Sequence, residues 1–87
     1  MELPKNAIAF ALDKFAHLYR FYGEHIAPNR LPDEVCLSDT QTREWIKRYK
    51  VRHVPGKGYL TCEVAAAMAY DRHEKQERVR ELRALTT

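Results

Sequence analysis

Hydrophobic positions in the first part of the chain recur every three or four residues. Between Pro4 and about residue 26 they fall at Ile8, Leu12, Phe15, Tyr19, Tyr22 and Ile26. This spacing predicts an amphipathic helix with one buried stripe. Pro4 suits the first turn of a helix, Gly23 weakens the last turn, and Pro28 with Asn29 ends it.

The apolar side of this N-terminal helix is wide. Four further residues extend it over more than half of the circumference: Phe10, Ala11, Leu18 and Phe21. Two interpretations stay open. Either the whole face packs into the domain core, or part of it packs against a second copy of the protein. The second interpretation predicts a homodimer through the N-terminal helix.

A second helix is predicted by a capping motif. Residues 29–37 form a connector or a short helix, in which Pro32 suits a first turn. Ser38 is followed three residues later by Gln41, which is the signature of a capping box. A helix from Asp39 to about Lys50 follows. Its inward face is predicted to carry Thr42, Trp45, Ile46 and Tyr49.

The next segment predicts a β-hairpin and a last helix. Two β-favouring arms, 51–54 and 59–61, flank a turn at Pro55-Gly56-Lys57-Gly58. From about Cys62 to the end no helix breaker occurs. Buried positions are expected at Val64, Ala67 and Met68. Beyond Asp71 the apolar content thins, which predicts a solvated second half.

In this order the elements predict a mostly α fold with one small β-hairpin, of winged helix-turn-helix type. A long amphipathic N-terminal helix and a C-terminal helix flank the central part. The 87 residues suffice for one small domain, 1–87. Its core is expected at roughly 4–70, with 71–87 as a charged, solvated helix end.

Several classes of protein are disfavoured by composition. No apolar run approaches the roughly 18 residues that span a bilayer. The N-terminus does not resemble a signal peptide, so a cytoplasmic protein of the host cell is expected. Cys36 and Cys62 are predicted to be free, small core residues. No C-x-x-C pair suggests zinc, and neither a metal nor a cofactor is expected.

Charge is concentrated in residues 43–57. This stretch holds six of the fifteen Lys and Arg residues and one acid, Glu44, so its charge is +5. The whole chain is +3, and the remainder is therefore −2. Apolar residues such as Trp45 run through the same stretch. A folded segment with a packed side and a positive side is predicted, and the commonest ligand of such a surface is a phosphate backbone.

The chemistry of these residues is typical of contacts to double-stranded DNA. Base edges in the major groove are expected to meet Thr40, Gln41 and Arg43, because Gln suits adenine and Arg suits guanine. Phosphate contacts supply affinity without sequence information. The candidates for these contacts are Lys47, Arg48, Lys50, Arg52, His53 and Lys57.

The run from Ser38 to Ala65 resembles the winged-helix modules of phage excisionases and of the wider MerR-like superfamily. Thr42, Arg43, Trp45 and Ile46 match the recognition-helix pattern, and Gly58, Tyr59, Leu60, Glu63 and Ala65 match the segment after the wing. The resemblance implies a regulatory or architectural role on DNA, as in a recombination directionality factor, with a recombinase as protein partner. Phage terminase small subunits are similar in combining this module with a charged helix.

An enzyme is not expected, because no nucleophile, base or glycine-rich phosphate loop has support in the sequence. The alternative function is a small phage-type inhibitor or adaptor that binds another protein. It would act through the aromatic helix and the basic patch, since a basic patch also suits an acidic protein surface. DNA binding through phosphates must weaken steeply with salt, whereas a mainly apolar protein contact would not.

Overall fold

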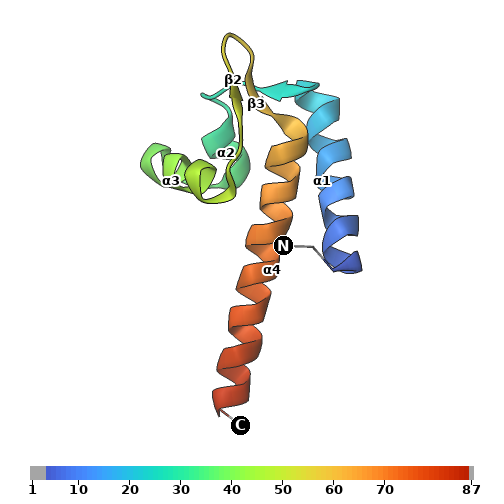
Figure 1. Ribbon diagram of the computed structural model, residues 1–87, viewed down its shortest axis with the longest axis vertical. Helices are drawn as coiled ribbons and strands as arrows, with labels where there is room; N and C mark the ends of the chain where they lie inside the picture. Colours follow the sequence, from blue (N-terminus) through green and yellow to red (C-terminus); the bar gives the residue numbers. More distant parts are fainter. Residues whose placement is uncertain (1–3, 87) are drawn as a thin grey trace.

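The computed structural model describes residues 4–86 (Figure 1). The elements in chain order are α1 (Lys5–Tyr22), β1 (His25–Ile26), α2 (Leu31–Val35), α3 (Asp39–Tyr49), β2 (His53–Val54), β3 (Gly58–Leu60) and α4 (Thr61–Thr86). The fold is therefore mostly helical with one small sheet, as predicted. The connector at 29–37 contains a short helix, and the N-terminal helix ends at Tyr22, before the predicted residue 26.

The helix α4 is the central element of the molecule. Figure 1 shows α1 along one side of its first half and α3 on the opposite side, while its C-terminal half extends beyond both. The first turns of α4 are rich in small residues, which let other helices pack closely against it from two sides. The buried ones include Ala65, Ala67 and Ala69. Among residues 4–86, no helix combines the length and apolar character that a membrane crossing requires.

The sheet has three antiparallel strands in the order β1-β3-β2. The predicted two-stranded hairpin was therefore incomplete, since β1 pairs with the other edge of β3 through His25 opposite Leu60 and Ile26 opposite Tyr59. Gly58, the first residue of β3, lies against Ile26 of β1. A Cβ atom at this position would stand 2.2 Å from the Ile26 carbonyl oxygen, and the φ of Gly58 is +118°. Only glycine fits this crossing without displacing a strand.

The core lies where α1, α2, α3 and the sheet meet α4. Its buried members are Leu18, Ile26, Leu31, Trp45, Val51, Val64, Ala65 and Ala67. The prediction that Trp45 is a core residue is confirmed. The predicted buried stripe at the N-terminal end is confirmed in part. Phe15 and Tyr22 pack against the core and Ile26 is fully buried, whereas Ile8, Leu12 and Tyr19 are 47%, 64% and 48% exposed. The buried residues of α1 itself are Ala7 and Leu18, and Leu18 belongs to the wider apolar face that was predicted.

The two cysteines are free, as predicted, but the prediction that they belong to the core was wrong. Cys36 and Cys62 are both exposed. Cys36 ends α2 in the left-handed conformation, with φ 57°, and its Sγ donates a hydrogen bond to the Asp33 carbonyl at 3.7 Å. Cys62 lies in the first turn of α4, between the buried Thr61 and Val64 but on the outer side.

Candidate nucleic-acid interface

The N-terminus of α3 is held by the capping box that the sequence predicted. The Ser38 hydroxyl accepts a hydrogen bond from the Gln41 backbone N–H at 3.2 Å, and the Gln41 side-chain oxygen accepts one from the Ser38 N–H at 3.1 Å. Thr42 adds a bond from its hydroxyl to the Ser38 carbonyl at 2.7 Å. A two-point contact of Gln41 with adenine uses the same amide oxygen, so such a contact competes with the cap.

The outer side of α3 carries one exposed polar line. Thr40, Arg43, Lys47 and Lys50 follow one another at steps of three, four and three residues and are all exposed. That spacing places Thr40, Arg43 and Lys47 on one face of α3, and Lys50 follows at the C-cap of the helix, in the left-handed conformation with φ 54°. Within the described part of the chain, no ion pair joins these side chains to a carboxylate. We call this set the α3 face.

The inner side of α3 is fixed by apolar packing and by polar contacts to α4. The rings of Trp45 and Tyr49 meet edge to face, with their centroids 5.4 Å apart. The Tyr49 hydroxyl donates to carboxylates of Asp71 and Glu74, at 3.3 Å each. Burial first, and then the two negative charges, raise the pKa of Tyr49 from 10.0 to about 12, while Arg48 acts in the opposite direction.

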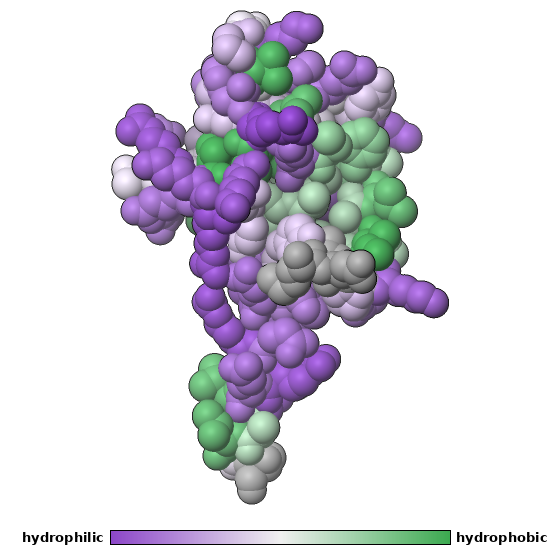
Figure 2. All heavy atoms as spheres, in the orientation of Figure 1, coloured by the Kyte–Doolittle hydropathy of each residue, from purple (hydrophilic) through white to green (hydrophobic). Residues whose placement is uncertain are grey.

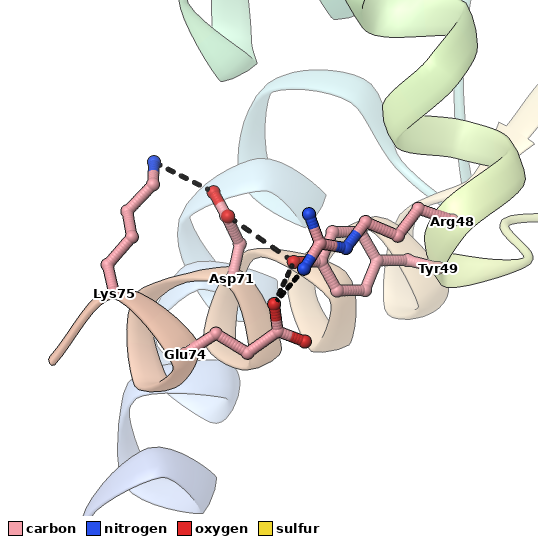
Figure 3. Close-up of polar contacts among 5 residues, drawn as sticks. All are labelled: Arg48, Tyr49, Asp71, Glu74 and Lys75. Atoms are coloured by element: carbon pink, nitrogen blue, oxygen red, sulfur yellow. Dashed lines mark hydrogen bonds and ion pairs between the residues drawn. The ribbon is translucent and has the colours of Figure 1, made fainter. Parts of the chain in front are cut away.

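Arg48 belongs to the same network and not to the α3 face. Its guanidinium forms an ion pair with Glu74, and Asp71 is paired in turn with Lys75 at 3.1 Å (Figure 3). Figure 3 shows Arg48 and Tyr49 of α3 directed at Asp71 and Glu74 of α4, with Lys75 on the far side of Asp71. Arg48 was predicted to contact phosphate; in the structure its guanidinium joins α3 to α4, and its side chain stays 53% exposed.

Arg52, before β2, is held in a similar way. Its backbone N–H and its Nε both donate to the carboxylate of Glu63, at 2.7 and 2.8 Å. The side chain of Arg52 nevertheless stays 74% exposed. This second pair fixes the start of the hairpin to the first turn of α4. Two of the predicted phosphate contacts are therefore already engaged by carboxylates of the same chain.

The hairpin presents the remaining two candidates. Lys57 is exposed at the turn, where its backbone N–H donates to the Val54 carbonyl at 3.0 Å. His53 is exposed on β2, and its ring packs edge-on against Tyr59 of β3, with centroids 5.2 Å apart. The turn itself depends on Gly56, whose φ is +78°.

A groove next to the interface was not foreseen from the sequence. Its volume is about 840 Å³, and it lies between α4 on one side and α1, α2 and α3 on the others. Apolar side chains in its lining include Phe10, Trp45 and Met68, and basic ones include Lys14 and Arg72. The Arg72 guanidinium lies 4.4 Å from the centroid of the Phe10 ring. Four separate segments build this groove, so no local pattern in the sequence could indicate it.

Comparisons of the chain with protein-family models, with curated proteins and with solved structures found no match. The resemblance to excisionase-type modules therefore stays a prediction. Within residues 4–86, no group of three His, Cys, Asp or Glu side chains is arranged to hold a metal ion.

Proposed function

We propose that the protein binds double-stranded DNA without catalysing a reaction. The α3 face enters the major groove, and the β2–β3 hairpin contacts the flanking backbone. The observation that carries the proposal is the α3 face itself: Thr40, Arg43 and Lys47 in one line on a capped helix and Lys50 at its C-cap, all exposed. A helix of this kind is the usual element by which small proteins read the major groove.

The order of the elements supports the same proposal. Helices α2 and α3 are followed by the β2–β3 hairpin, and β1 adds a third strand that anchors the hairpin to the end of α1. In winged helix-turn-helix proteins a recognition helix is followed by such a hairpin, or wing. We therefore assign this chain to that architecture, with a role like that of an excisionase or small phage-type regulator in the host cytoplasm.

The contacts sort into three groups. Thr40 and Arg43, nearest the start of α3, face base edges. Lys47, Lys50 and Lys57 contact phosphates and provide affinity that is independent of sequence. The third group consists of residues that position the others: Gln41 caps α3, while Arg48 and Arg52 connect α3 and the hairpin to α4. His53 adds a backbone contact from the wing.

A pair of double variants tests the proposed face. Lys47→Glu combined with Lys57→Glu changes the charge by −4 on the α3 face and the hairpin. Lys5→Glu combined with Arg20→Glu changes it equally on α1, on the other side of α4. We expect the first variant to lose at least about tenfold in affinity for a random duplex at low salt, and the second to lose much less. Equal losses in both would refute the assigned face.

Base reading by Arg43 has its own test. Duplexes selected from a random library by the unmodified protein supply a preferred sequence. Arg43→Ala should then bind the preferred duplex more weakly by about 1–3 kcal/mol and random duplex almost as before. A loss of the same size on both duplexes would show that Arg43 contacts only phosphate.

The groove favours a second candidate function, the binding of a protein partner. The groove is lined by the apolar side chains of Phe10 and Met68 and by the basic side chains of Lys14 and Arg72. This lining suits an amphipathic segment of a partner protein, with apolar residues on one side and acidic residues beside them. Such a protein would shift no duplex DNA at any salt concentration. The groove variant Phe10→Ala would then abolish partner capture, whereas Lys47→Glu would leave it unchanged.

A further inference from the structure

Three apolar side chains on α1 stay exposed although they share one helical face. Ile8, Leu12 and Tyr19 are separated by four and seven residues and are each about half exposed or more. Phe15 continues the line between them and is half-buried, with its ring centroid 5.5 Å from that of Tyr19. We call these four residues the α1 stripe. Figure 2 shows hydrophobic residues gathered over α1 and, separately, at the end of α4.

The residues beside the α1 stripe leave room for a second helix to pack closely against it. The next positions around the helix include Ala9 and Ala16, which are small and exposed. Of the charged residues of α1, Lys5 continues the line of the stripe three residues before Ile8, whereas Asp13, Lys14 and Arg20 lie at other positions around the helix. Small flanking side chains let another helix approach to the usual 8–10 Å between axes. The stripe also lies on α1, across α4 from the α3 face, so covering it leaves the proposed DNA contacts open (Figure 1).

We propose that the α1 stripe is the interface of a homodimer, covered by the α1 stripe of a second copy. The sequence of the stripe itself supports a second copy, because its two halves complement one another. In an antiparallel pair related by a two-fold axis, Ile8 meets Tyr19 of the other copy and Leu12 meets its Phe15. Each aliphatic side chain then packs on an aromatic ring, as a self-complementary interface requires.

The size of the stripe sets the strength of the dimer. Half-exposed side chains of this kind offer roughly 300–400 Å² of apolar surface on each copy, about half of the ~800 Å² per partner that stable complexes bury. The dimer is accordingly expected to be weak, and to form only at high protein concentration. The dimer would carry two α3 faces and could therefore bind two half-sites of one DNA duplex at the same time.

Sedimentation equilibrium of the full chain, without DNA, tests the dimer from micromolar to millimolar concentration. Leu12→Glu is expected to raise the dissociation constant at least about tenfold, because it places two carboxylates in the apolar contact. The matched control is Leu82→Glu on α4, since Leu82 is 62% exposed and Leu12 is 64% exposed. Circular dichroism confirms that each variant is folded, and Ile8→Glu repeats the test at a second position.

The results separate the alternatives. Association of the unmodified chain that is lost in Leu12→Glu and kept in Leu82→Glu supports the proposal. A chain that stays monomeric at all concentrations overturns it, as does association that Leu82→Glu abolishes and Leu12→Glu does not. The double variant Ile8→Glu with Tyr19→Lys tests the orientation, because opposite charges meet only in an antiparallel pair. Weaker association of this double variant than of Ile8→Glu alone overturns the antiparallel arrangement.

Discussion

Replacing Glu74 by Gln removes the carboxylate that joins α4 to α3. Two groups of α3 lose a charged partner: the Arg48 guanidinium and the Tyr49 hydroxyl. Tyr49 keeps its second acceptor, Asp71. At the same time the substitution deletes a negative charge beside the proposed DNA-binding surface and releases Arg48. The account therefore predicts two effects of opposite sign, a loss of stability and a gain in DNA affinity.

The size of both effects follows from exposure. The side chains of Arg48 and Glu74 are 53% and 28% exposed, so their ion pair contributes about 0.5–1 kcal/mol. With the weakened tyrosine bond, we expect a total loss of about 1–1.5 kcal/mol in the free energy of unfolding. If the released Arg48 makes one more phosphate contact, the slope of log K against log salt steepens by about 1.

Urea unfolding followed by tryptophan fluorescence measures the first effect, because Trp45 is the single tryptophan and packs against Tyr49. Fluorescence anisotropy of a labelled duplex measures the second. Glu77→Gln is the matched control, since Glu77 forms its ion pair with Arg80, inside α4 and away from α3. Equal stability of the two variants would show that Glu74 does not hold α3 to α4, and a fall in DNA affinity for Glu74→Gln would show that Arg48 does not reach the DNA.

Three further predictions concern the parts that position the site. Gly58→Ala should lower the free energy of unfolding by roughly 3 kcal/mol or more, because the added Cβ would collide with β1. Gly56→Ala has open space around the added Cβ and should cost only about 1 kcal/mol. Thermal unfolding measures both. Ser38→Ala should cost about 1 kcal/mol in urea unfolding, and an unchanged midpoint would argue against the capping box as a source of stability. Because the pKa of Tyr49 is raised from 10.0 to about 12 in the folded protein, its hydroxyl should add to the free energy of unfolding below pH 10, and this stabilisation should be lost as the pH rises toward 12. The stabilisation should amount to about 1–2 kcal/mol and be absent in Tyr49→Phe. Parallel profiles of stability against pH for the two proteins would contradict this prediction.

Local patterns in the sequence were sufficient for some features and not for others. The capping box joins residues three apart, so the spacing of Ser38 and Gln41 was enough to predict it. The hairpin was predicted from its turn residues. The strand β1 was missed because it is two residues long and its partner β3 lies more than thirty residues further on. No local pattern marks a pairing of that range.

In the candidate site, too, some features could be predicted from local sequence and others could not. Periodicity correctly separated the packed side of α3, with Trp45, from its basic side. It could not reveal that Arg48 and Arg52 face acids of α4, because Glu74 is 26 residues and Glu63 eleven residues away in sequence. On α1, the large apolar residues suggested the buried face. The small residues of α4 favour a close helix contact instead, and that contact left Leu12 exposed.

The salt dependence of duplex binding by the unmodified chain decides whether the α3 face and the hairpin bind the DNA backbone. The three lysines proposed to contact phosphates (Lys47, Lys50 and Lys57), which form no ion pair within residues 4–86, predict a slope of log K against log salt of about −3 on random duplex. Anisotropy titrations at several salt concentrations supply that slope. A slope shallower than about −1, or no binding at low salt, would contradict the assignment of this surface to DNA.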